Sequence, residues 1–345
     1  MNKGNIVNDF RIKQSLETIQ KLLENKNKII IFSHLGRPTE GVYEESLSLK
    51  PICKYLSALL ERDIKFFNSY RDNINFEDYE IAMLENVRFN TGEKSSNSDL
   101  SKAYASLADY FVFDAFGVAH RKESSTFGVS EYLKTYPGLN ISNEIHTINQ
   151  LINEDSRPMT IIISGAKVST KLIVIQKLLA KCDFMILGGG ILNTFLKAKG
   201  NEIGNSLYEE DLVNEAKNIL SSDFSSKIIF PIDLSCESES KPKNIDVSNI
   251  SKNDIIFDVG EKSLEHIKSI INKSSAIFWN GPLGYVEKEP FDRGTIELAK
   301  TIAEHNCFSI IGGGDTLPII ENLNLQSQFS CLSTGGGSLL TYLEG

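Results

Sequence analysis

The fold class is decided by one stretch, TIIISGAKVSTKLIVIQKLLA, which spans residues 160–180. Its first part, residues 160–164, is a short run around three isoleucines, and such β-branched runs predict a buried strand. Gly165 permits a tight turn, and the apolar spacing over residues 171–180 predicts an amphipathic helix. A strand, a glycine turn and a helix in this order are typical of a parallel sheet covered by helices.

The same alternation continues in both directions along the chain. Further strands are predicted over residues 28–33, 63–67, 79–84, 110–113, 183–187, 227–231, 276–279 and 307–311. Further helices are predicted over residues 13–23, 49–60, 192–199, 264–271 and 291–303. These strands are too many for one compact unit, and 345 residues correspond to about two domains.

We therefore predict an α/β fold of two Rossmann-like domains, each a parallel sheet flanked by helices. The boundary falls where Pro137 and Gly138 end one block and a helical stretch begins. The first domain then spans residues 1–142 and the second spans residues 143–345, with residues 143–153 as a hinge helix between them.

Composition and charge exclude several classes of protein. No apolar run approaches the ~18 residues of a membrane span, and the polar N-terminus shows no secretory signal. The net charge of −9 argues against a nucleic-acid surface. The five cysteines are odd in number and form no C-x-x-C pair, which favours reduced thiols. We expect a cytoplasmic monomer that binds small molecules and neither nucleic acid nor a membrane.

Three predicted strands of the first domain each lead into a segment that carries arginine. These arginines are Arg37, Arg88 and Arg121, and two of the segments add a histidine, His34 or His120. Ligands of parallel sheets bind beyond the carboxyl ends of the strands, and arginine captures carboxylate and phosphate. The pattern predicts a pocket for a small polyanion. Either histidine alone has an equally good structural interpretation, as a buried ring that satisfies backbone groups.

Strands of the second domain lead instead into glycine and lysine. Glycine triplets occupy residues 188–190, 312–314 and 335–337, each after a strand-like run. Glycine lets a ligand approach the backbone, and amides at helix starts favour phosphate. Lys167 and Lys171 are predicted one helical turn apart, on one face, where both reach phosphate. Neither a Walker motif nor a G-x-G-x-x-G fingerprint is present, so this is a nucleotide site of another kind.

Three further residues of the second domain have two interpretations each. Asp315 could hold Mg²⁺ together with substrate phosphates, or it could cap a helix. Glu287 could meet ribose hydroxyls, or it could be an ordinary surface carboxylate. Trp279 fits the core better than a stacking platform.

The combined motifs resemble those of the phosphoglycerate kinase family, in the same order and spacing through nearly the whole chain. The motifs lie at residues 33–38, 84–89, 114–117, 119–121, 165–168, 279–282, 312–315 and 333–337. The resemblance implies a glycolytic kinase that moves a phosphoryl group reversibly between 1,3-bisphosphoglycerate and Mg-ADP, giving 3-phosphoglycerate and ATP. Closure at the hinge would exclude water from this transfer.

The resemblance also implies residue roles. The 3-phosphoglycerate side would be bound in the first domain by Arg11, His34, Arg37, Arg88 and Arg121. The nucleotide would be bound in the second domain by Lys167, Lys171, Asn280, Glu287, Gly312, Gly313, Gly314, Asp315 and Thr316, with Gly188, Gly189 and Gly190 lining the adenine pocket. Arg11 and Lys167, helped by the amides of Gly313 and Gly314, would neutralise charge during transfer, and Asp315 would hold Mg²⁺.

The chain also departs from the family pattern. The family's first strand and its C-terminal tail have no counterpart between Met1 and Gly345. Thr170 stands where the family usually has Asp, and Glu261 where Pro is usual. One alternative is therefore a truncated, weakly active or inactive nucleotide-binding remnant of the same family. A second alternative is a dinucleotide-dependent dehydrogenase, which the missing fingerprint disfavours.

Overall fold

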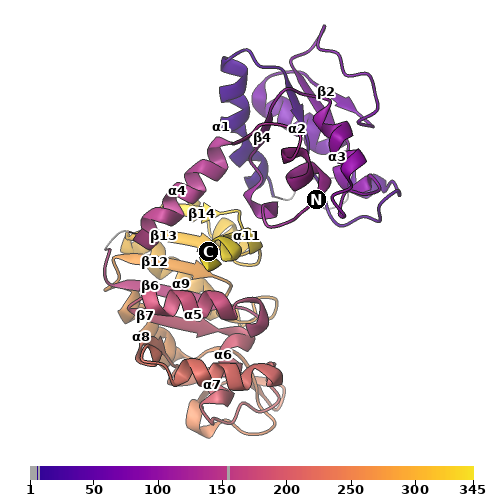
Figure 1. The fold of residues 1–345 in the computed structure, drawn as a ribbon. Helices are drawn as coiled ribbons and strands as arrows, with labels where there is room; N and C mark the ends of the chain where they lie inside the picture. The colour runs from indigo at the N-terminus through magenta and orange to yellow at the C-terminus, as the bar shows by residue number, and fades with distance from the viewer. Residues whose placement is uncertain (1–5, 7, 154–155) are drawn as a thin grey trace. The chain divides into compact units, whose positions relative to one another are not determined.

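The computed structural model describes residues 6, 8–153 and 156–345. The chain divides into two compact units, Met1–Glu144 (unit 1) and Ile145–Gly345 (unit 2). Each unit has strands and helices of its own (Figure 1). Helix α4 (Leu139–Asn153) runs across the point of division and includes the predicted hinge helix. Within the described ranges no helix has the length and apolarity that crossing a membrane requires.

Unit 1 alternates strands and helices. Its strands are β1 (Ile29–Ile31), β2 (Ile64–Phe67), β3 (Ile81–Leu84), β4 (Phe111–Phe113) and β5 (Thr135–Pro137). Its helices before α4 are α1 (Phe10–Glu24), α2 (Lys50–Leu60) and α3 (Ser98–Ala105). The strands pair in parallel in two sheets, one of order β1-β3-β2 and one of β4 with β5. The parallel pairing predicted for this part of the chain is confirmed.

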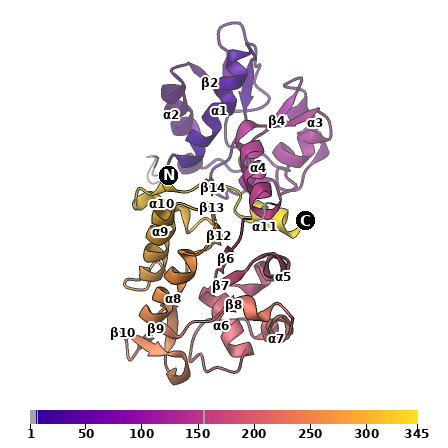
Figure 2. The same ribbon diagram turned by 90° about the vertical axis from the view of Figure 1, so that its left-hand side faces the viewer.

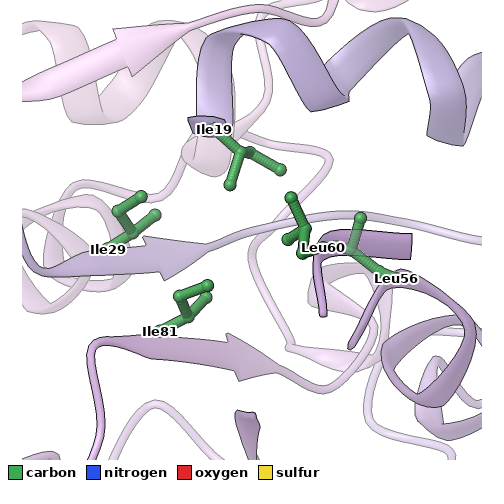
Figure 3. Packing of buried hydrophobic residues seen from close by; sticks show 5 residues of the cluster. All are labelled: Ile19, Ile29, Leu56, Leu60 and Ile81. Atoms are coloured by element: carbon green, nitrogen blue, oxygen red, sulfur yellow. The ribbon is translucent and has the colours of Figure 1, made fainter. Parts of the chain in front are cut away.

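The core of unit 1 lies between the sheet and the helices that cover it. Ile19 of α1 and Leu56 and Leu60 of α2 point toward Ile29 of β1 and Ile81 of β3 (Figure 3). Ile81 is completely buried because β3 is the middle strand, with β1 and β2 on either side. Each such side chain contributes about 1.5–3 kcal/mol by its burial, so this cluster holds the sheet edge in place for the loops that follow it.

Unit 2 is built on a parallel sheet of six strands in the order β14-β13-β12-β6-β7-β8 (Figure 2). The strands are β6 (Met159–Ser164), β7 (Phe184–Gly188), β8 (Ile228–Ile229), β12 (Ala276–Asn280), β13 (Phe308–Gly312) and β14 (Cys331–Ser333). The helices are α5 (Leu172–Lys181), α6 (Gly189–Ala198), α7 (Val213–Leu220), α8 (Glu261–Ile271), α9 (Arg293–His305), α10 (Leu317–Asn322) and α11 (Gly337–Glu344).

Helices cover both faces of this sheet. Helices α8 and α9 pack together on one side, and α5 and α11 pack together on the other, as Figure 2 shows. The central strands β6 and β12 are buried along their whole length, and their sequences, MTIIIS and AIFWN, are mainly apolar. This doubly covered sheet confirms the fold class predicted from residues 160–180.

Unit 2 also contains a second sheet, which the sequence prediction missed. It joins β9 (Asp233–Ser238), β10 (Lys241–Asp246) and β11 (Ile255–Val259) in antiparallel pairs. The predicted parallel sheet of unit 2 is present, and this antiparallel sheet is an addition to it that was not predicted. The hairpin turns at Glu239 and Ser240, which have φ of 49° and 61°. Such turns usually carry asparagine and glycine, so the common sequence signal for a hairpin was missing.

Candidate functional sites of the two units

In unit 1, positive charge gathers around His34. Arg11, Arg88 and Arg121 come from separate segments, yet the charge of each acts on the His34 ring. Burial of the ring, followed by the charges of Arg88, Arg121 and Arg11, lowers the pKa of His34 to about 4. The imidazole is therefore neutral near pH 7, and it can offer a hydrogen bond without adding charge to the cluster.

Arg88 is the buried member of this cluster, with 4% of its surface exposed. Its Nη1 donates to the Gly36 carbonyl at 2.8 Å, and its Nη2 donates to the Glu123 carboxylate at 3.2 Å. Arg121 lies 3.6 Å from the same carboxylate. The Nε atom of Arg88 is buried without a partner among the described residues. Arg88 is thus held mainly by the protein, and its buried Nε is a donor that no described residue satisfies.

Glu85 and Asn86, which precede Arg88 in the sequence, position the loop that carries His34. The Glu85 carboxylate accepts from the Leu49 amide at 2.8 Å, and it also accepts from Ser48 Oγ at 2.7 Å. The side-chain amide of Asn86 donates to the Leu35 carbonyl at 2.8 Å. These contacts hold the loop against the start of α2.

Two further arginines predicted for the unit 1 site face solvent, and two anchoring carboxylates were not predicted. Arg11 in the first turn of α1 and Arg37 on the loop after β1 are both exposed. Neither the partner carboxylate Glu123 nor the anchoring role of Glu85 was predicted. An acidic residue two positions after Arg121 was the available signal for Glu123.

In unit 2, the glycine triplet at residues 188–190 lies where β7 passes into α6. A Cβ atom on Gly189 would stand 2.8 Å from the Gly165 carbonyl oxygen, and one on Gly190 would stand 2.3 Å from that of Ala166. These distances leave no room for a side chain, so the close approach of two backbone segments requires glycine here. Two loops that were predicted to bind one nucleotide therefore contact each other.

Lys167 and Lys171 do not share a helical face, so the prediction that they lie one helical turn apart on one face is wrong. A short 3-10 turn, Val168–Thr170, separates them, and α5 begins only after Lys171. Lys167 is exposed, whereas Lys171 donates to the Ser164 carbonyl and, at 2.7 Å, to Asn280 Oδ1. Burial lowers the pKa of Lys171 to about 8, while the charge of Asp315 acts in the opposite direction. Lys171 joins the ends of β6 and β12, and Lys167 is the lysine open to a ligand.

Two buried polar atoms near the second glycine triplet have no partner among the described residues. They are Nδ2 of Asn280 and Oγ1 of Thr316. A Cβ atom on Gly312 would lie 3.2 Å from the first, and one on Gly313 would lie 3.1 Å from the second. Since buried polar groups normally have partners, these two atoms leave hydrogen-bonding capacity unused at this loop.

The structure decides two of the open interpretations in unit 2. Thr316 occupies the N-cap position of α10, without a side-chain cap hydrogen bond, so Asp315 is not the cap residue, and its carboxylate is exposed beside the triplet. Trp279 is fully buried and belongs to the core, with Nε1 donating to the Gly281 carbonyl at 2.7 Å. Glu287 is exposed on the loop after β12 and its position fits either interpretation.

The carboxylates of unit 2 bear on where a metal ion could bind. The part of the chain that the structure describes holds no group of three or more His, Cys, Asp or Glu residues around a common point. Mg²⁺ commonly uses one or two carboxylates and completes its shell with water and phosphate oxygens. The exposed carboxylate of Asp315 fits a metal ion that arrives with a nucleotide.

An arginine cluster on one α/β unit and glycine loops with an open lysine on the other define a phosphotransferase of the kinase class. The family model for phosphoglycerate kinase matches residues 1–345. Among curated relatives, "Phosphoglycerate kinase" from Francisella philomiragia is 42% identical over 99% of this chain and 89% of its own length. The protein of that name from Legionella pneumophila is 43% identical over 99% of this chain and 88% of its own length. The chain belongs to the phosphoglycerate kinase family.

Solved structures agree with this assignment. The structure of phosphoglycerate kinase from Coxiella burnetii has a TM-score of 0.87 and 39% identity, covering 100% of this chain and 90% of that one. The crystal structure of the protein of that name from Pyrococcus horikoshii has a TM-score of 0.86 at 28% identity, with the same coverage. These similarities support a kinase, and they support neither the dehydrogenase nor the inactive remnant.

Proposed function

We propose that this chain transfers a phosphoryl group reversibly between 1,3-bisphosphoglycerate and Mg-ADP, giving 3-phosphoglycerate and ATP. The observation that carries the proposal is that each unit holds the chemistry for one partner of this reaction. Unit 1 gathers three arginines around a neutral histidine, which suits a small acid with phosphate and carboxylate groups. Unit 2 supplies glycine loops, an open lysine and two unpartnered polar atoms, which suit a nucleotide.

In unit 1, the substrate would contact exposed cations first. Arg11, Arg37 and Arg121 retain donors that face solvent or the cluster, and Arg88 adds its Nε atom. Glu123 neutralises part of this charge in advance, so the free pocket does not have to hold several unpaired guanidinium groups. His34, neutral near pH 7, would bind a carboxylate or phosphate oxygen by donating from its ring.

In unit 2, Lys167 and the amides of Gly313 and Gly314 would meet the phosphates. A Cβ atom on Gly314 would find no atom within 4 Å, so the backbone there is open to a ligand. Asp315 would hold Mg²⁺, which when bound neutralises phosphate charge. Asn280 and Thr316 would bind through their free polar atoms, Lys171 would fix the strand ends, residues 188–190 would line the base, and Glu287 would meet the ribose.

The transfer needs no covalent intermediate with the protein. Charge in its transition state spreads over the oxygens of the transferring group, so positioning and charge neutralisation supply the rate. Arg11 on unit 1 and Lys167 on unit 2 are the exposed cations that we assign to this neutralisation. Location in the cytoplasm, the monomeric state and closure of the two units during transfer stay predictions from the sequence.

A coupled assay with ATP, Mg²⁺ and 3-phosphoglycerate tests the proposal directly. The expected result is turnover that requires all three and that Arg11→Ala reduces strongly. Trp279 is the only tryptophan, and its indole Nε1 donates a hydrogen bond to the Gly281 carbonyl. We therefore expect its fluorescence to report ADP binding independently of turnover. ADP binding without any turnover would contradict the proposal and support the nucleotide-binding remnant.

A further inference from the structure

The Glu209 carboxylate accepts hydrogen bonds from the turn that follows Lys167. It accepts from the Ser169 amide at 2.8 Å and from Ser169 Oγ at 2.6 Å. The Val168 amide also donates to it. These three donors belong to the single 3-10 turn that begins directly after Lys167. One carboxylate therefore fixes the backbone from which the Lys167 side chain extends.

Glu209 is itself anchored to the glycine triplet after β7. Its amide donates to Thr194 Oγ1 at 3.1 Å, and the Thr194 hydroxyl donates to the Gly190 carbonyl at 2.9 Å. Thr194 is fully buried in α6, so this connection is shielded from water. Glu209 thus connects the turn of Lys167 with the start of α6, which are the two segments already in contact through Gly190 and Ala166.

The charge on Glu209 is maintained at neutral pH. Burial raises the pKa of this carboxyl, but hydrogen bonds from Ser169 and Val168 and the charge of Lys167 outweigh burial, and the net pKa lies below the usual value. Charge-assisted hydrogen bonds to an ionised carboxylate are stronger than neutral ones. The positive charge of Lys167 acts on Glu209, although no ion pair of the described residues joins them, so the ammonium stays available to a ligand.

We propose that Glu209 is a positioning residue that sets where the Lys167 ammonium stands for nucleotide phosphates. This inference rests on the proposed nucleotide site of unit 2. It assigns the carboxylate a role through Lys167 and not through direct contact with the nucleotide phosphates, since two like charges would repel.

The adjacent Glu210 provides a matched control. It is exposed and accepts a hydrogen bond only locally, from Tyr208 Oη at 3.1 Å. The substitution Glu210→Gln removes the same charge from the next position without touching the Lys167 turn. Comparing Glu209→Gln with Glu210→Gln therefore separates the effect of the hydrogen bonds to the Lys167 turn from the effect of losing one negative charge near the site.

The test is a double-mutant cycle with Lys167→Ala, measured as kcat/KM for MgATP and as ADP affinity from Trp279 fluorescence. Glu209→Gln is expected to lower kcat/KM by about tenfold, the effect of losing one charge-assisted hydrogen bond. The KM for 3-phosphoglycerate should stay unchanged, and Glu210→Gln should match the wild type. In the Lys167→Ala background, Glu209→Gln should cause no further loss, because the side chain it positions is gone.

Two results would overturn the inference. One is equal activity of Glu209→Gln and Glu210→Gln. The other is a tenfold loss that persists in the Lys167→Ala background, which would mean that Glu209 acts independently of Lys167. Ser169→Ala, which keeps the carboxylate and removes one donor, checks the result should Glu209→Gln fold poorly, and it should show a smaller loss that also disappears with Lys167→Ala. A wild type that neither binds ADP nor turns over would instead overturn the proposed function, and the inference with it.

Discussion

The candidate sites of the two units are built in opposite ways. In unit 1 the binding groups are charged side chains that the protein has already paired, with Arg88 and Arg121 sharing the Glu123 carboxylate. In unit 2 the groups are mainly backbone, with polar atoms of Asn280 and Thr316 left without partners. A site made of side chains needs counter-charges to exist without its ligand, whereas a site made of glycine loops needs only a fixed backbone.

The largest expected effect tests the pre-paired charges of unit 1. Glu123→Ala should lower the free energy of unfolding by about 3–5 kcal/mol, because it leaves the buried guanidinium of Arg88 without its partner. Denaturant unfolding measures the change. The double variant Arg88→Met/Glu123→Leu should recover most of the stability, since it removes both charges. Equal stability of Glu123→Ala and the wild type would contradict the description of unit 1 as a site held by its own charges.

The next effect concerns the open cation of unit 2. Lys167→Ala should reduce kcat by about 10²–10³, the usual cost of removing one preorganised group that stabilises transition-state charge. Stability should hardly change, because Lys167 is exposed. Steady-state kinetics of the coupled assay measure the loss, and Lys217→Ala, an exposed lysine of α7, is the control. A normal rate for Lys167→Ala would remove this residue from the chemistry.

A third prediction tests whether unit 2 depends on its backbone. Gly313 has φ of 112°, and a Cβ atom there would lie 3.1 Å from the Gly281 nitrogen and from Thr316 Oγ1. Gly313→Ala should therefore destabilise the fold by about 1–3 kcal/mol and weaken ADP binding. Thermal unfolding and Trp279 fluorescence measure both effects. Gly314→Ala, where nothing lies within 4 Å, should leave stability unchanged, and similar losses in both variants would refute the argument from φ and space.

The smallest effect is a pH dependence in unit 1. The pKa of His34 is about 4 in the folded chain and about 6.5 when exposed, so the unfolded chain binds a proton first as the pH falls. His34 should therefore reduce stability progressively from pH 6.5 to pH 4. His34→Gln should remove this part of the dependence, about 1 kcal/mol by pH 6 and more toward pH 4, in unfolding experiments across that range. Glu93, whose pKa is also raised, is present in both the wild type and His34→Gln, so its contribution to the pH dependence cancels when the two are compared.

Much of the fold could be predicted because its signals are local. The apolar runs of β6, β7, β12 and β13 and the glycines that follow them are adjacent in the sequence. Arg88 and Arg121 of the cluster around His34 were predicted from strand ends, since parallel strands deliver their loops to one edge. The burial of Trp279 followed from its place at the end of an apolar strand.

The missed features depend on partners far apart in the sequence. Nothing near Arg88 indicates that Glu123 will neutralise it, 35 positions later. The face shared by Lys167 and Lys171 was predicted from helical spacing, but a 3-10 turn, Val168–Thr170, lies between them and the helix begins at Leu172. Glu209 was not identified, because its partner Ser169 lies 40 positions earlier.

The antiparallel sheet of unit 2 has one consequence for association between molecules. Strand β10 forms one edge of this sheet, and its unpaired backbone groups are a ready template for a strand of another chain. This edge begins with Lys241, Pro242 and Lys243, all exposed. Proline has no backbone N–H to donate to a strand of another chain. The two lysines would also carry their positive charge into the new contact, where a second copy of this edge would place lysines against them. Strand β10, which the sequence pattern did not predict, is therefore protected against edge-to-edge aggregation.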